Sequence, residues 1–206
     1  MMKKLSMLAL VLVLFSACGS DFPGQPGDVV RVQQNSYGNG NLKEEIPYNK
    51  DSRIHGVKRT FYDNGQLESE AKYENGKMEG PYKEYYENGQ IRADAVYKDN
   101  VQKGTVVVYH DNGNIWIQGN ALGNDKFSGN YKEYYKNGNI KFEYNFDDKG
   151  QKDGLQRTYN QDGSLEKEES YKNNLKDGIF RYYENGAIIK EEEFKNGAKV
   201  PKRIKN

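Results

Sequence analysis

Few residue types in this chain of 206 residues could perform chemistry. The chain has one cysteine, Cys18, and two histidines, His55 and His110. A nucleophilic triad needs a histidine beside a serine or cysteine. Cys18 stands in an export signal, His110 occupies a slot that holds tyrosine in most of the similar segments, and His55 lies between two such segments. The sequence therefore predicts no catalytic residue, and we expect that the protein is not an enzyme.

Acidic residues are numerous, and their number makes chance pairs common. The chain has 30 Asp and Glu residues, so an acid–base reading requires two of them in an apolar cleft. Four carboxylates that recur at regular spacing each face a base in the register derived below, which gives them a structural role: Glu70, Asp94, Glu143 and Glu168. No zinc spacing, calcium loop or phosphate-binding glycine motif occurs. We expect neither a metal nor a cofactor.

One segment, VVVYHDNGNIWIQGNAL, could form a binding site. On the face that carries charges in similar segments it presents Val107, Tyr109, Trp116 and Gln118, with Tyr109 expected directly opposite Trp116. An apolar patch on a charged face often marks an interaction site, and Trp and Tyr are typical anchors. We predict a binding site there. In the alternative interpretation, the chain curls and buries this spot.

The N-terminus predicts the compartment. Two lysines precede an apolar run over residues 5–15 and the residues Ser16-Ala17-Cys18, which is the layout of a secretory signal. The run is too short to span a bilayer. The residues FSAC resemble the bacterial lipobox, in which the cysteine receives a diacylglycerol and becomes the new N-terminus. We predict a lipoprotein signal peptide over 1–17, lipidation of Cys18, a flexible tether over 18–30 and a repeat domain over 31–206.

The same comparison predicts the location. Gly19 follows the cysteine, where an aspartate would favour retention at the inner membrane, so we expect a lipid-anchored protein of the bacterial cell envelope, at the outer membrane. Removing residues 1–17 takes away two lysines and leaves 29 basic against 30 acidic residues. Non-specific binding to nucleic acid or anionic lipid needs clustered positive charge, and the signs here are interleaved. We expect no nucleic acid partner, and membrane contact through the lipid anchor only.

A period of 24 to 25 residues organises the rest of the chain. Glycines at 65, 89, 113, 138, 163 and 186 each follow Asn or Asp and precede Leu or Ile by two places, and Gly40 marks an incomplete earlier copy. Such self-similarity indicates a repeat array. Asn-Gly between β-prone runs is the strongest short-range hairpin signal. The pattern predicts an all-β fold, an elongated single-layer antiparallel sheet of about six tandem β-hairpin repeats.

A two-residue Asn-Gly loop would fix the register of each hairpin. It places the residue six before the glycine opposite the residue five after it. The resulting pairs are complementary: Arg59 with Glu70, Lys83 with Asp94, Lys132 with Glu143 and Arg157 with Glu168. In the remaining full repeat both charges are absent, because the positions hold Val107 and Gln118. The same register predicts a more buried face around Leu67, Ile91, Ile115, Ile140, Leu165 and Ile188.

The repeat unit, Y-Y-x-N-G-x-[IL]-x-x-E-x-x-[YF]-x-N-G, resembles the variant MORN repeat of bacterial YwqK-family antitoxins and of many bacterial lipoproteins, over residues 37–197. The resemblance implies stacked β-hairpins in one layer and protein-binding roles, and it brings no catalytic residues. We therefore expect a protein-binding or scaffolding module with an unknown protein partner. Two alternatives remain open: a toxin-neutralising immunity or antitoxin protein, and a carbohydrate-binding module that holds a glycan on its aromatic rows.

Overall fold

The protein is described over residues 22–201 in a computed structural model. All regular structure there is β, and within each of the two units named below the antiparallel strands follow one another in chain order. This confirms the predicted all-β sheet of tandem hairpins. Contacts divide the chain into two units, residues 1–90 and 91–206. Within residues 22–201, no helix is long and apolar enough to cross a membrane.

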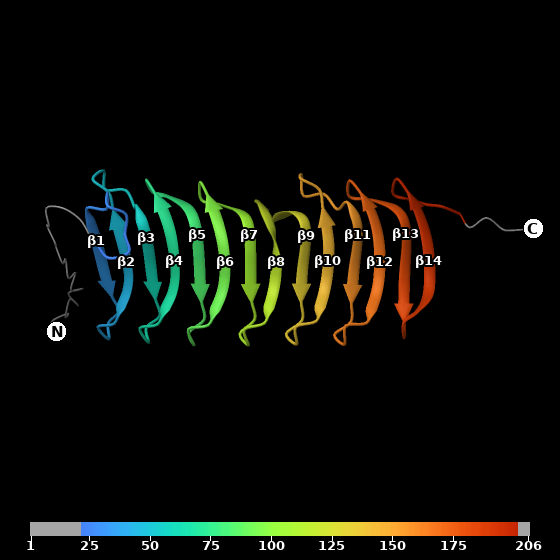
Figure 1. Ribbon diagram of the computed structural model, residues 1–206, viewed down its shortest axis with the longest axis horizontal. Coiled ribbons are helices and arrows are strands. Elements are labelled where there is room, and N and C mark those ends of the chain that lie inside the picture. Colours follow the sequence, from blue (N-terminus) through green and yellow to red (C-terminus); the bar gives the residue numbers. More distant parts are fainter. Residues whose placement is uncertain (1–21, 202–206) are drawn as a thin grey trace, which may run out of the picture. The chain divides into compact units, whose positions relative to one another are not determined.

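Each unit is a run of neighbouring strands (Figure 1). The first unit contains β1 (Arg31–Ser36), β2 (Leu42–Tyr48), β3 (Gly56–Phe61), β4 (Leu67–Glu74) and β5 (Lys77–Tyr85). The second contains β6 (Ile91–Lys98), β7 (Val101–Tyr109), β8 (Ile115–Gly123), β9 (Lys126–Tyr134), β10 (Ile140–Phe146), β11 (Gly154–Tyr159), β12 (Leu165–Lys172), β13 (Leu175–Glu184), β14 (Ala187–Lys195) and β15 (Ala198–Lys199).

The repeated Asn-Gly turns are not the two-residue loops that we predicted. In the turn after β3, Gly65 N donates to Tyr62 O at 2.9 Å and Tyr62 N donates to Gln66 O at 2.8 Å. Only Gly65, at φ 86°, has a positive φ in this turn. This is a three-residue loop with a glycine bulge. The register then shifts by one residue, so that Phe61 pairs with Leu67 and Thr60 with Ser69.

Two-residue loops occur elsewhere in the chain. At the other end of the strands, Asn75 and Gly76 join β4 to β5 with φ values of 50° and 88°. The last repeat, which is one residue shorter before its Asn-Gly, uses Asn185 and Gly186 in the same way, at 51° and 75°. The predicted turn is therefore right for the last repeat and wrong for the others. The tighter turn accompanies the missing residue before Asn185.

Hydrogen bonds between successive turns explain the period. The Asn64 side chain donates to Glu87 O, and the Tyr62 hydroxyl donates to Tyr85 O at 2.6 Å. In the second unit, Asn137 donates to Gln161 O at 2.8 Å. Each bond ties a turn to the chain 23 or 24 residues later. We call these contacts the turn staples. In these turns the asparagine before the glycine acts through its side-chain amide, not through a positive φ.

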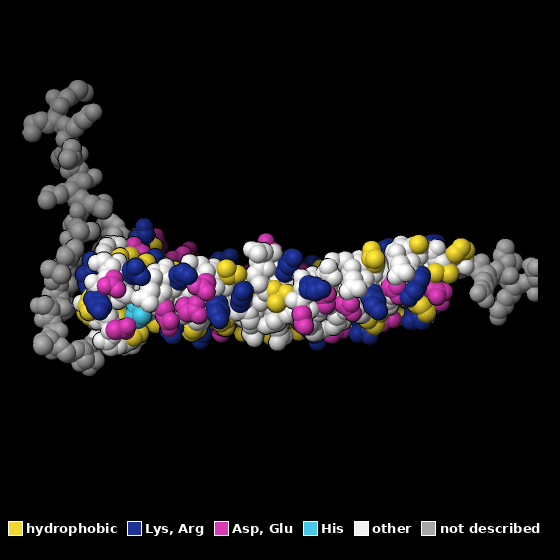
Figure 2. Space-filling model, turned by 90° about the horizontal axis from the view of Figure 1, so that it is seen from above, with side chains coloured by type: hydrophobic (Ala, Val, Ile, Leu, Met, Phe, Trp, Pro, Cys, Tyr) yellow, Lys and Arg dark blue, Asp and Glu magenta, His cyan; other side chains and the backbone are white. Residues whose placement is uncertain are grey.

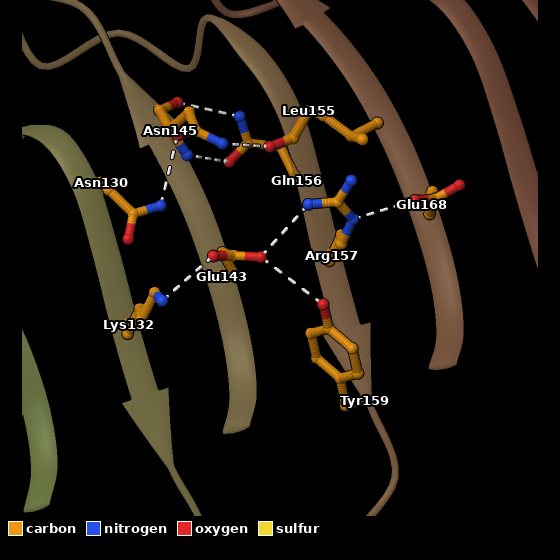
Figure 3. Close-up of polar contacts among 9 residues, drawn as sticks. All are labelled: Asn130, Lys132, Glu143, Asn145, Leu155, Gln156, Arg157, Tyr159 and Glu168. Carbon is orange, nitrogen blue, oxygen red and sulfur yellow. Dashed lines mark hydrogen bonds and ion pairs between the residues drawn. The ribbon is translucent and has the colours of Figure 1, made fainter. Parts of the chain in front are cut away.

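A row of alternating charges crosses the strands and confirms the predicted register. In the first unit, Arg59 pairs with Glu70 in the register and lies 3.7 Å from both Glu45 and Glu70. In the second unit the row is Lys132, Glu143, Arg157, Glu168, Arg181 and Glu191, one residue from each strand from β9 to β14. Figure 3 shows its first four members, with N–O distances of 3.3, 3.2 and 2.9 Å. We call this row the charge ladder.

The core is thin and is made largely of small side chains. The buried residues include Ala71 in the first unit and Ala95, Val106, Ala121 and Phe180 in the second. The apolar series that we expected to be more buried is half-buried at Leu67 and exposed at Ile188. A single-layer sheet leaves these side chains only one neighbouring strand on each side for cover. Packing therefore contributes less here than in a two-layer fold, and polar contacts between strands take a larger share.

Two glutamine side chains bond to backbone where strand pairing is interrupted. Between β10 and β11 only two residue pairs form. Gln156, among the most deeply buried side chains, accepts from Asn145 N and donates to Asn145 O, as Figure 3 shows. In the first unit, Gln25 donates to Val57 O at 2.8 Å and accepts from Val57 N at 2.6 Å. An amide can satisfy a backbone donor and acceptor at once.

The Gln25 contact corrects the predicted tether. We placed residues 18–30 in a flexible tether, yet Val29 is buried and Val30 N donates to Tyr48 O at 2.9 Å. Asp28 also lies 3.0 Å from His55, whose side chain is only 13% exposed. Folded structure thus begins before residue 31. Two prolines and two glycines in this stretch form tight turns, which composition alone does not distinguish from a tether.

The ladder predicts an acid dependence of stability. Burial raises the pKa of Glu143, but hydrogen bonds from Lys132 and Arg157 outweigh this and hold the pKa below its ordinary value of 4.5. Such a group stabilises the fold above its unfolded pKa, and the contribution is lost as the pH falls through the folded pKa. Glu143→Gln should cost about 1 kcal/mol at pH 7. The difference in free energy of unfolding between Glu143→Gln and wild type, measured by thermal unfolding, should disappear as the pH falls from about 5 to about 3.

Glu166 provides the matched control, because this exposed carboxylate lies on β12 outside the ladder. Glu166→Gln should change the free energy of unfolding by no more than about 0.5 kcal/mol at any pH. A Glu143→Gln penalty that is unchanged at pH 3 would show that lost packing, not lost charge, destabilises the variant.

Candidate binding surface on β7 and β8

The predicted binding residues lie where the charge ladder stops. Val107 on β7 pairs with Gln118 on β8. The same row continues to Asp94 on β6 and to Lys132 on β9. Alternation of sign would require a base at 107 and an acid at 118. We call these two positions the ladder gap, because an aliphatic and a neutral amide side chain stand there instead.

Trp116 lies beside the gap, but not opposite Tyr109. The register shifts between Val108, which pairs with Ile117, and Tyr109, which pairs with Ile115. Trp116 is the extra residue of a bulge, so the prediction that Tyr109 directly faces Trp116 is wrong. The physical reason is the three-residue turn, whose extra loop residue displaces the first pairs of the hairpin by one. Beyond the bulge the predicted pairing holds.

The indole of Trp116 stacks on His110. The ring centroids are 5.6 Å apart and the ring planes 23° apart. Nε2 of His110 lies 3.1 Å from Tyr134 O, where tyrosine hydroxyls form the turn staples of other repeats. As a donor, this nitrogen would carry the proton of the neutral ring. His110 thus joins two repeats through a turn staple and packs against one face of the indole. Trp116 keeps 42% of its surface exposed, so residues 22–201 do not curl over it.

Tyrosine hydroxyls near the gap differ from their counterparts in other repeats. Tyr159 donates to Glu143 of the ladder at 3.5 Å, and Tyr85 donates to Glu70 at 3.3 Å. Tyr134 occupies the corresponding position beside Gln118, a neutral amide instead of a carboxylate. Among residues 22–201, the Tyr134 hydroxyl has no hydrogen-bond partner. A partner molecule at the ladder gap would therefore contact apolar surface as well as a hydroxyl that makes no hydrogen bond within residues 22–201.

Many aromatic rings of the second unit are already covered by lysines. Lys152 lies over Tyr144 at 4.8 Å and over Tyr171 at 5.1 Å from the ring centroids. Lys176 covers Phe180 and Phe194 in the same way. Cation–π contacts of this kind occupy the ring face that a sugar would need. Among residues 22–201, Trp116 stacks on one ring, that of His110, and no lysine or arginine lies over it, so much of the indole remains available as an aromatic surface.

Comparison with known proteins agrees with this architecture. The profile of the MORN repeat variant matches residues 32–50, 54–77, 78–99, 102–121, 128–148, 152–173 and 176–196. These matches cover well over half of the chain. The chain belongs to the MORN repeat variant family. No curated protein matches it in sequence.

Each MORN repeat contains two consecutive strands. The seventh repeat, beyond the six predicted, is the first in the chain: the copy at Gly40 that looked incomplete is a full hairpin of β1 and β2, with Gln34 opposite Glu45. The site lies in the fourth MORN repeat, residues 102–121. This repeat differs from its neighbours in the charge of its side chains, but its backbone pairs in the same way.

Sequence reasoning missed a second series of glycines. They recur with the repeat period and all have positive φ: Gly56, Gly80, Gly104, Gly129, Gly154 and Gly178. At Gly178, a Cβ would lie 2.9 Å from Cβ of Ser170 on the neighbouring strand. The spacing was visible in the sequence, because it follows that of the Asn-Gly turns to within one residue. The predicted lipidation site, Cys18, lies outside the described residues.

The ladder gap can be closed by substitution. Val107→Arg with Gln118→Glu restores alternation from Asp94 to Lys132, and each new cross-strand pair should contribute about 0.2–1 kcal/mol. We expect a higher unfolding temperature for the double variant. Val107→Glu alone places a carboxylate opposite Asp94 and should lower it. If the double variant is less stable than wild type, Val107 contributes more by packing than a ladder charge would.

Proposed function

We propose that this protein is a lipid-anchored envelope protein that binds a partner protein at the ladder gap and Trp116. MORN repeats are commonly protein- or membrane-binding modules. The observation that carries the proposal is Trp116, an indole supported on one side by His110 and 42% exposed beside two uncharged ladder positions. Large aromatic residues of this kind supply most of the binding energy in many interfaces.

The charge pattern supports a protein partner. Basic and acidic side chains are interspersed over the face shown in Figure 2, with no patch of one sign. Nucleic acid would need such a patch. We also infer that the protein acts by binding, not catalysis, because both histidines make structural contacts. His55 lies near Asp28 and accepts from Asn75 N at 3.3 Å, while His110 staples a turn.

The proposal can be tested with one substitution and a matched control. Trp116→Lys should weaken capture of the partner from envelope extract by about 30-fold or more, equivalent to about 2 kcal/mol. Glu68, Lys141 and Glu166 hold the same bulge position in other repeats, so a charge is accepted there. We expect the free energy of unfolding to change by no more than about 0.5 kcal/mol.

Glu166→Lys is the control, since it changes charge at the same bulge position two repeats away. It should leave capture intact. The proposal is wrong if Trp116→Lys retains capture, or if that variant unfolds at a markedly lower temperature, because the indole would then be a packing residue. Binding to glycans that depends on Trp116 would favour the carbohydrate-binding alternative.

The lipid anchor has its own test. In the proposed topology Cys18 is acylated after removal of residues 1–17, and no apolar run between residues 19 and 206 is long enough to span a bilayer. Cys18→Ser should move the protein from the membrane fraction to the soluble fraction after cell disruption. Retention of a cleaved, unacylated Cys18→Ser chain on membranes would contradict the anchor.

A further inference from the structure

The last long strand of the second unit has an open outer edge. Its inner edge pairs with β13 from Glu184–Ala187 to Gly178–Phe194. On the outer side, β15 pairs only with Phe194 and Lys195, and Val200 N donates to Glu193 O. Among residues 22–201, no strand pairs with the outer edge of β14 between residues 187 and 192. Unpaired strand edges are ready sites for another strand.

Several contacts that join one repeat to the next are unmet at this edge. Ile188 is 52% exposed and Ile189 61%, whereas Leu165, which matches Ile188 one repeat earlier, is half-buried beside β13. The side chain of Asn185 makes no hydrogen bond among the described residues, although Asn137 reaches the following turn. Figure 2 shows hydrophobic side chains along this C-terminal part of the second unit.

The charge ladder ends at β14, and among residues 22–201 its last carboxylate has a basic neighbour on one side only. Glu143 and Glu168 each receive bases from both neighbouring strands, and their side chains are 18% and 14% exposed. Among residues 22–201, Glu191 has a base on one side only, Arg181 at 2.9 Å, and it is 51% exposed. A strand added outside β14 would complete the ladder if it carried Arg or Lys in this row.

We propose that the edge of β14 between Ala187 and Glu192 binds an extended segment of a partner protein as an added antiparallel strand. The segment carries a base opposite Glu191 and, next to it, an aromatic side chain opposite Lys190, as Arg181 and Tyr182 of β13 lie opposite Glu168 and Lys167. Backbone hydrogen bonds supply affinity in this mode, and side chains supply specificity. The charged residues of β14 disfavour indiscriminate pairing, so complementarity selects the partner. This site is separate from Trp116 and does not rest on the function proposed above.

Strand β13 shows what such a segment looks like, because it lies against β12 as the partner would lie against β14. Arg181 faces Glu168, and Tyr182 follows it opposite Lys167. A labelled peptide of residues 175–184, LKDGIFRYYE, is therefore the probe. Its fluorescence anisotropy should rise saturably with the protein. The same peptide with its arginine replaced by glutamate should bind at least about tenfold more weakly, since it places two carboxylates together.

A charge swap on the protein makes the test specific. Glu191→Arg should reverse the preference, so that the glutamate peptide binds more tightly than the arginine peptide. Trp116→Lys should leave both affinities unchanged, which separates this site from the ladder gap. Absence of saturable binding, or equal binding of the two peptides to wild type, would overturn the proposal.

Two other occupants of the edge can be recognised in the same experiment. If the peptide binds only to a chain that ends at Pro201, the chain's own residues 202–206 take the edge. If the protein alone sediments as a concentration-dependent assembly that Glu191→Arg abolishes, a second copy takes it. Either result would show that the occupant is not a partner protein.

Discussion

The structure depends on hydrogen bonds that tie turns to the turns of the next repeat. A single-layer sheet has no second layer to fix the position of a hairpin, and its buried side chains are mostly small, such as Ala71 and Ala95. The turn staples supply that constraint at one end of the strands, where Asn112 donates to Lys136 O at 2.8 Å. At the other end, Gly197 N donates to Lys176 O at 2.8 Å. With both ends of a hairpin held, every side chain in a row meets the same neighbour in the next repeat.

The charge ladder is a consequence of that constraint. Exposed ion pairs are weak one by one, but a carboxylate such as Glu143 here lies between two bases and is largely covered. Its pKa is lowered although burial alone would raise it. The same holds for Glu168, where Arg157 and the Tyr183 hydroxyl outweigh burial and lower the pKa. Regular spacing turns isolated pairs into a network, which gives a thin sheet stability that its apolar core cannot supply.

The sequence was sufficient for the fold class, the period and the ladder register, because these depend on pairs far from the turns. It was not sufficient for the turns themselves. A three-residue loop followed by one bulged residue leaves the distant register unchanged from that of a two-residue loop. Lys132 therefore pairs with Glu143 in either case, and only the pairs next to the turn differ. That degeneracy explains why the ladder was predicted correctly while Trp116 was placed opposite the wrong residue.

The N-terminal contacts escaped prediction for a different reason. Gln25 binds both backbone groups of Val57, a contact over 32 residues that has no periodic signature. In a repeat protein, the period identifies the residues that every copy shares, and shared residues stabilise the array. Side chains that bind one partner must differ from the repeated pattern, while the backbone still follows it. The site that we propose at Trp116 breaks the pattern because an indole fills a bulge that elsewhere holds a charge. The site that we propose at the edge of β14 breaks it because contacts that inner repeats complete are unmet there. Recognition sites in such a sheet are therefore found by asking where an otherwise regular row stops.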